Sequence, residues 1–177
     1  TITSANSISF NSSLTATVST TSTGGRGGAF TFSIVAGSGS ATVNPTTGLI
    51  TAIEFGTVTL TATSAGDTNY NSAITSQLIT IGQTTPTLTI TSANSISVGD
   101  SLTATVTTTA AGSQGGAITF SITNGSGSAS VNPTTGLITV ISIGTVTLTV
   151  SSAGDTYYYT ANASQLITIV ANIPTTI

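Results

Sequence analysis

The stretch VNPTTGLITAIEFGTVTLTATSAGDTNYNSA, residues 43–73, decides the fold. Within it, GTVTLTA alternates apolar and hydroxyl side chains, so that Val58, Leu60 and Ala62 share one side and the threonines between them share the other. A period of two is typical of a β-strand with one buried face, and it does not fit a helix. NPTTG and AGD interrupt the alternation with residues that favour turns. The stretch therefore predicts short strands separated by tight turns.

The same signals continue on both sides of this stretch and predict an all-β fold. Seven strands are expected in the first 82 residues, at 2–9, 13–20, 28–35, 40–44, 48–53, 56–63 and 74–82. Seven short strands with one polar face each predict an immunoglobulin-like antiparallel β-sandwich of two sheets. The expected core residues are the apolar ones on the inner faces: Leu14, Val18, Phe32, Ile34, Val43, Val58, Leu60 and Ile79, with their counterparts 88 residues later.

A long internal repeat sets the domain organisation. Shifting the chain by 88 residues aligns it with itself without a gap, and 61 of the first 88 residues are identical to their counterparts. This period is too long for a solenoid repeat of roughly 20–50 residues but suits a whole sandwich domain of roughly 100. We therefore expect a first module at 1–82, a linker containing Pro86 at 83–88, a second module at 89–170, and at 171–177 a linker into a further repeat.

The composition narrows the classes of function. Only 5 of the 177 residues are charged, while there are 42 threonines and 26 serines, and Cys, His, Met, Trp and Lys are absent. Without a basic patch, nucleic acid is not expected as a partner. No run approaches the ~18 apolar residues of a membrane-spanning helix, so membrane insertion is not expected. The hydroxyl-rich, almost uncharged composition favours an exported, extracellular protein at the cell surface.

Two pairs of repeated residues are candidates for local sites. Asp67 precedes Tyr70, and Asp155 precedes Tyr158, in the sequence AGDT. A cation ligand is one interpretation, but Ca²⁺ requires 6–8 oxygen ligands, which one carboxylate per module cannot supply. We expect a structural turn instead, with the carboxylate accepting backbone N–H bonds and the tyrosine packed at a sheet corner. No metal and no cofactor is expected.

The NPTTG turn supplies further structural candidates. Pro45 and Pro133 preset the backbone at its start, and Gly48 and Gly136 allow an unusual φ at its end. These four residues are expected to shape a turn rather than to bind a ligand.

The remaining chemical candidates are few. Arg26 is the sole basic side chain and stands in the loop GGRGG, where it either contacts an anion or glycan or is simply solvated. Tyr157, Tyr158 and Tyr159 form the one aromatic cluster, which suggests sugar stacking unless alternation turns at least one ring inward. Because the chain has no His, Cys or Lys and its four carboxylates are scattered, no catalytic residue and no enzymatic activity is expected.

The run at 43–73 and its copy VNPTTGLITVISIGTVTLTVSSAGDTYYYTA at 131–161 resemble bacterial immunoglobulin-like repeats of the Big and MBG type. The resemblance covers almost all of both copies, through a TTGLIT turn, a GTVTLT strand and an AGDxxY turn. It implies a module of a very large bacterial surface adhesin or filament, and it implies no particular ligand, because fold analogy alone does not assign function.

Three functional hypotheses follow. The first is a stalk or spacer module in adhesion or surface motility, whose partners are the neighbouring repeats of the same chain, with any glycan or surface ligand bound elsewhere in the full protein. The second is a building block of an extracellular filament or surface layer, in which other copies pack laterally because the chain has no lysine that could prevent pairing at the sheet edges. The third is an accessory carbohydrate-binding module, which requires an exposed aromatic platform.

Overall fold

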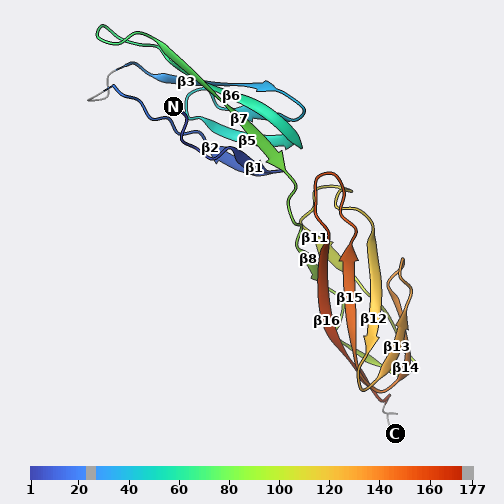
Figure 1. Cartoon of the computed structure of the whole chain (residues 1–177). Coiled ribbons are helices and arrows are strands. Elements are labelled where there is room, and N and C mark those ends of the chain that lie inside the picture. Colours follow the sequence, from blue (N-terminus) through green and yellow to red (C-terminus); the bar gives the residue numbers. More distant parts are fainter. Residues whose placement is uncertain (23–26, 173–177) are drawn as a thin grey trace. The chain divides into compact units, whose positions relative to one another are not determined.

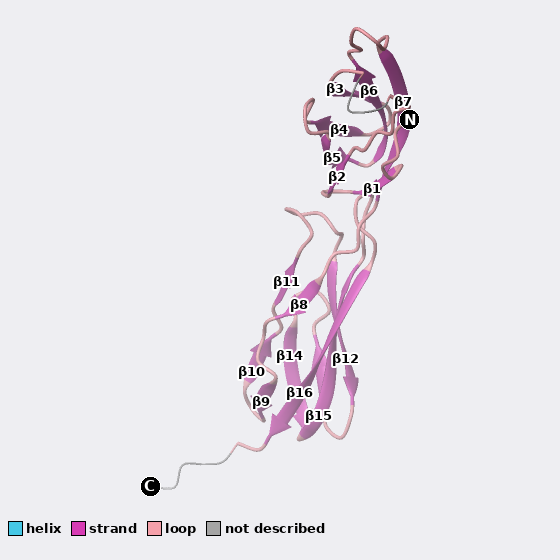
Figure 2. Ribbon diagram, turned by 90° about the vertical axis from the view of Figure 1, so that its left-hand side faces the viewer, coloured by secondary structure: helices cyan, strands magenta, loops and turns pink. Residues whose placement is uncertain are grey.

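The computed structural model describes residues 1–22 and 27–172, so Arg26 and Pro174 lie outside the described residues. In this part all regular elements are β-strands, which confirms the all-β prediction (Figure 2). The chain divides into two compact units, Thr1–Thr84 and Thr85–Ile177, with the division inside the expected linker. Among the described residues no helix has the length and apolar character needed to cross a membrane.

The described residues of the first unit form seven strands in two sheets. The strands are β1 (Ser7–Ser9), β2 (Ser13–Thr15), β3 (Phe30–Ala36), β4 (Ser40–Val43), β5 (Leu49–Glu54), β6 (Gly56–Ser64) and β7 (Ala73–Gly82). The four-stranded sheet has the order β1-β7-β6-β3, and the three-stranded sheet has the order β2-β5-β4.

The second unit repeats this arrangement with nine strands. They are β8 (Leu88–Ile90), β9 (Ser95–Ser97), β10 (Ser101–Thr103), β11 (Val106–Thr108), β12 (Ile118–Asn124), β13 (Ser128–Val131), β14 (Leu137–Ser142), β15 (Gly144–Ser152) and β16 (Ala161–Val170). Their sheets are β12-β15-β16-β9, β10-β14-β13 and the pair β11-β8. Figure 1 shows β12, β15 and β16 side by side in this unit.

The central strands follow the alternation seen in the sequence. In β6 the burial alternates along the whole strand, with Val58 and Leu60 at 0% exposure and the threonines between them partly exposed on the other face. The central strands β6 and β15 are each hydrogen-bonded on both sides: β6 lies between β3 and β7, and β15 lies between β12 and β16. Apolar residues from both sheets of the second unit form one buried cluster, as expected for a β-sandwich.

Two predicted strands are wrong in their extent. The expected strands 2–9 and 13–20 are each interrupted: Ile2 pairs with Val18 in an isolated antiparallel bridge, while β1 joins β7 and β2 joins β5. The reason is that both segments change partners: Ile2 and Val18 pair with each other, whereas the rest of each segment pairs with a strand of a different sheet, so neither can keep one continuous ladder. In the second unit the counterpart of the bridge is long enough to form β8 and β11.

One strand of each unit, β1 in the first and β9 in the second, also departs from the antiparallel expectation. β1 pairs with β7 in parallel, and β9 pairs with β16 in parallel, whereas the other paired strands are antiparallel. Alternation within a strand carries no information about the direction of its partner, so the sequence pattern could not reveal this pairing.

The predicted core of the first unit is partly correct. Val58, Leu60 and Ile79 are completely buried, whereas the other five expected core residues are only half-buried: Leu14, Val18, Phe32, Ile34 and Val43. Those five belong to strands at sheet edges or beside the bridge, where neighbouring strands cover one side only. Ile50 and Ile81 are completely buried and were not predicted.

Candidate functional site

The most highly organised polar contact in the first unit surrounds Asp67. Its carboxylate accepts backbone N–H bonds from Asn69 at 2.8 Å and Tyr70 at 2.9 Å within its own loop. The other carboxylate oxygen accepts the N–H of Gly27 at 2.7 Å, 40 residues earlier in the chain. The Asp67 N–H in turn donates to the carbonyl of Tyr70 at 2.8 Å. One side chain therefore both closes a turn and joins the loop before β3 to the loop before β7.

Close backbone packing reinforces this junction. The hydroxyl of Ser64 and the N–H of Gly66 both donate to the carbonyl of Gly27, the latter at 3.0 Å. Gly28 lies so close to Gly66 that an added Cβ would stand 3.0 Å from the Gly66 nitrogen and closer still to its carbonyl oxygen. The two loops approach this closely because glycine leaves room for backbone to meet backbone.

The second unit reproduces the same contacts around Asp155. The carboxylate accepts N–H bonds from Gly115 at 2.6 Å, Tyr157 at 2.8 Å and Tyr158 at 2.9 Å. The Ser152 hydroxyl and the Gly154 N–H both donate to the Gly115 carbonyl. The structure thus places the predicted residues Asp67 and Asp155 in turns that tie two loops together, and among the described residues no group of His, Cys, Asp or Glu is arranged to hold a metal ion.

These hydrogen bonds favour the ionised carboxylates. The N–H of Gly27 is the largest cause that holds the pKa of Asp67 below its ordinary value of 3.8, and the N–H of Gly115 does the same for the pKa of Asp155. A carboxylate whose folded pKa lies below its unfolded pKa stabilises the fold fully above the unfolded pKa, and this stability is lost as the pH falls through the folded pKa.

Stability is accordingly expected to be constant between about pH 5 and 9 and to fall below about pH 4. Asp155→Asn should lower the urea midpoint of the second unit at pH 7 and reduce its further loss between pH 4 and 2. Urea titrations followed by circular dichroism at several pH values test this. Asp100→Asn, in the turn between β9 and β10, is the matched control and should leave the pH 7 midpoint unchanged. A neutral-pH midpoint unaffected by Asp155→Asn would contradict the assigned role.

The NPTTG turn is built as its residue types suggest, with one addition. Gly48 and Gly136 both have a φ of +71°, which glycine adopts readily. The carbonyls of Pro45 and Pro133 accept the N–H of Phe32 at 2.9 Å and of Phe120 at 3.0 Å. These bonds tie the turn to the edge strand of the opposite sheet.

Sequence reasoning missed the asparagine that opens this turn. Asn44 Oδ1 accepts the N–H groups of Thr46 and Thr47 at 3.0 and 2.9 Å, and Asn132 repeats both bonds in the second unit. The signal was present, since an asparagine before proline favours this side-chain-closed turn.

It also missed two glutamines. Gln77 Nε2 donates to the Ser4 carbonyl at 3.3 Å, and Gln165 Nε2 donates to the Ser92 carbonyl at 3.3 Å. Each glutamine thereby holds the segment that leads to the parallel-paired strand of its unit, from Ile2 to β1 in the first unit and from β8 to β9 in the second. The available signal was a glutamine at an inward position of an otherwise apolar alternation, SQLITI, in both copies.

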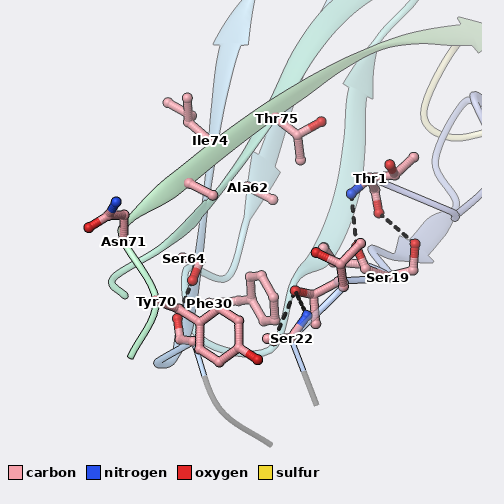
Figure 3. A pocket seen from close by; sticks show the side chains of 15 residues that line it. Thr1, Ser19, Ser22, Phe30, Ala62, Ser64, Tyr70, Asn71, Ile74 and Thr75 are labelled. Atoms are coloured by element: carbon pink, nitrogen blue, oxygen red, sulfur yellow. Dashed lines mark hydrogen bonds between the residues drawn. The ribbon is translucent and has the colours of Figure 1, made fainter. Parts of the chain in front are cut away.

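The tyrosines do not form a continuous platform. Tyr158 is 2% exposed and its hydroxyl accepts the N–H of Ala111 at 3.0 Å, whereas Tyr159 is 54% exposed. The first unit has a hollow of about 380 Å³ near Tyr70, in which Figure 3 shows the rings of Phe30 and Tyr70 beside Ser64. Among the described residues its lining side chains are hydroxyl, amide and apolar, and none is a carboxylate or a basic group.

Neither protein-family models nor curated proteins give a match when compared with this chain. Its function is therefore inferred from its own residues and geometry.

Proposed function

We propose that this chain is a tension-bearing spacer from a very large secreted bacterial adhesin, built of bacterial immunoglobulin-like modules and located at the cell surface. Its partners are the neighbouring repeats of the same polypeptide, and it carries out no catalysis. The proposal is supported by the repetition of self-contained sandwiches and, above all, by the way in which the last strand of each unit is paired, β7 with β1 and β16 with β9.

The decisive observation is the parallel ladder between these strands. In the second unit β9 lies beside the end of β16, with Ser95 opposite Thr168, Ile96 opposite Ile169 and Ser97 opposite Val170. Backbone bonds extend the ladder at both ends, from the Thr168 N–H to the Asn94 carbonyl and from the Val98 N–H to the Val170 carbonyl, each at 2.9 Å. The first unit has the same ladder between β1 and β7.

This pairing suits a chain that is pulled from its two ends. The second unit begins at β8, which lies at one end of the sandwich, and β16 runs to the other end (Figure 1). Because β9 and β16 are parallel, opposite forces on the preceding and following chain slide one strand along the other. All ladder bonds then resist together. In an antiparallel terminal hairpin they would open one after another.

The nearly uncharged surface supports the same role. The described ionisable side chains are Glu54, Asp67, Asp100, Asp155 and the tyrosines. Glu54 is the exposed last residue of β5, and the three aspartates lie between strands. Interactions that do not depend on exposed charges are not screened by salt. The module should therefore hold its length at any ionic strength met outside the cell.

Single-molecule force spectroscopy of the intact chain tests the proposal. Val98→Pro removes the one N–H that donates to Val170, and loss of a bond worth about 1 kcal/mol should make forced unfolding of the second unit about fivefold faster at constant force. Ile138→Val is the matched control: it removes a buried methyl group from the three-stranded sheet at a similar cost of about 1 kcal/mol. If the three-stranded sheet is still intact when the parallel ladder ruptures, Ile138→Val should change the unfolding rate of the second unit under force by less than about twofold.

Equal acceleration by the two variants would show that the parallel ladder does not bear the load, and would remove the support for the spacer role. Urea unfolding of both variants provides the required check that their equilibrium stabilities are similar.

A further inference from the structure

The three-stranded sheet of each unit carries an outward row of apolar side chains along its central strand. In β5 the buried Ile50 and Ala52 alternate with outward residues, of which Leu49 is 44% and Ile53 is 48% exposed. Phe55, directly after the strand, continues the row at 42% exposure. We name the outward residues Leu49, Thr51, Ile53 and Phe55 the β5 stripe.

The second unit has the same row on β14. Leu137 is 45%, Ile141 is 65% and Ile143 is 58% exposed, and we name these three with Thr139 the β14 stripe. Large apolar side chains left in water in a repeated pattern usually mark an interaction surface.

Comparison of the two copies separates this surface from the other sheet. On the outer face of the four-stranded sheet the exposed apolar residues of the first unit are Val35, Ile74 and Leu78. Their counterparts 88 residues later are Thr123, Asn162 and Leu166, so two of the three become polar. All three apolar positions of the stripe stay apolar. The whole set of exposed apolar side chains therefore recurs with the repeat on the three-stranded sheet, whereas on the four-stranded sheet only Leu78 recurs, as Leu166.

The neighbours of the stripe define the chemistry of its partner. Thr51 lies opposite Ser13 on β2 and Thr42 on β4, and Leu49 lies opposite Thr15. These outward neighbours are exposed hydroxyl residues. The exposed Glu54 stands beside the β5 stripe, but its counterpart in the second unit is Ser142, so no charge recurs with the stripe. A charged partner would therefore lose hydration along the array without gaining an opposite charge at each module. The fitting partner is another uncharged, apolar surface.

The size of the surface indicates which kind of uncharged partner binds to it. Three strands spaced by about 4.8 Å and a stripe of about 20 Å give about 300 Å² per module. A stable interface buries about 800 Å² on each partner, so one stripe is too small to hold a complex alone. A second chain of the same repeat supplies a matching stripe every 88 residues, and several weak contacts then add.

We propose that the β5 and β14 stripes bind the same stripes of a second copy of this chain, so that repeat arrays associate side by side. This lateral association goes beyond the spacer role. The edges of the three-stranded sheet that carries the stripe contribute little, because its edge strands β2 and β4 are only three and four residues long, which is one way in which proteins block edge pairing.

Sedimentation velocity on two lengths of array tests the proposal. The 177-residue chain should be largely monomeric at about 10 μM, and a head-to-tail duplicate with twice as many stripes should associate at least about 100-fold more tightly. Ile53→Lys with Ile141→Lys in every copy should abolish this association. Val35→Lys with Thr123→Lys adds the same charges to the outer face of the four-stranded sheet and should leave it unchanged. Circular dichroism and urea unfolding establish that each variant is folded, and Ile53→Thr with Ile141→Thr replaces the lysine pair if it is not.

Three results would overturn the proposal. The duplicate could remain monomeric at about 100 μM, the stripe variant could associate as tightly as the parent, or the control pair could abolish association equally. A monomeric duplicate that adsorbs to an apolar surface through its stripes would assign them to a foreign ligand. The spacer role is tested independently, since the stripe variants leave the parallel ladder intact and Val98→Pro leaves the stripes intact.

Discussion

Replacing Gly116 with alanine is expected to destabilise the second unit by about 2–5 kcal/mol. Gly116 has a φ of +76°, and a left-handed conformation costs a residue with a Cβ about 1–2 kcal/mol. The added Cβ would also stand 2.9 Å from the Gly154 nitrogen and closer to the Gly154 carbonyl oxygen. Neither neighbour is a flexible side chain, so the overlap adds a further cost of about 1–3 kcal/mol. The loops joined by Asp155 would be forced apart.

Gly112→Ala is the matched control for this prediction. Gly112 also has a positive φ, +58°, but an added Cβ there would meet nothing within 4 Å. It should cost only about 1 kcal/mol. Urea unfolding followed by circular dichroism, with amide hydrogen exchange to assign the loss to the second unit, measures both. Equal losses in the two variants would mean that backbone conformation alone, and not the loop contact, makes Gly116 necessary.

Leu148→Ala is expected to have an effect of similar size, about 3–5 kcal/mol. Leu148 is completely buried on β15 and belongs to the apolar cluster formed by both sheets. Its removal leaves a cavity between strands that are hydrogen-bonded on both sides and cannot collapse freely. With so small a core, the second unit should be close to unfolded at 37 °C.

The neighbouring Thr149→Ala provides the control. Thr149 lies on the other face of the same strand, where its hydroxyl pairs with that of Ser164 at 3.0 Å. Its loss should cost less than about 1 kcal/mol. Thermal unfolding of the two variants is a direct test of the burial alternation, and it would refute the assignment of faces if Thr149→Ala proved the more damaging.

The strands with the clearest alternation were the ones that sequence reasoning located best. The predicted strand 56–63 is β6 almost residue for residue, and 74–82 is β7. Both are long and have partners along most of their length, so one face of each strand is turned to the core and the other to solvent along its course. The burial of expected core residues at sheet edges, such as Leu14 and Ile34, was overestimated. A period of two shows which face of the strand a residue is on, but it does not show how deeply that face is covered.

The candidate site was predictable to a smaller extent. A turn at Asp67 followed from AGDT, but its bond to Gly27 did not, because no local pattern relates residues 40 positions apart. The same limit applies to Gln77 and Ser4, which are brought together from opposite ends of the unit.

By itself, then, the sequence determined what depends on near neighbours and on composition: most of the strands, the turns at Pro45 and Gly48, the 88-residue repeat, and the absence of His, Cys and Lys. Tertiary structure alone decided the change of partner along the first segment, the parallel pairing of β1 with β7 and of β9 with β16, and the exposure of the stripes. The physical reason is that alternation records only which side chains avoid water. Which strands become partners, and in which direction, depends on contacts between residues far apart in the chain, whose closure the whole sandwich must stabilise.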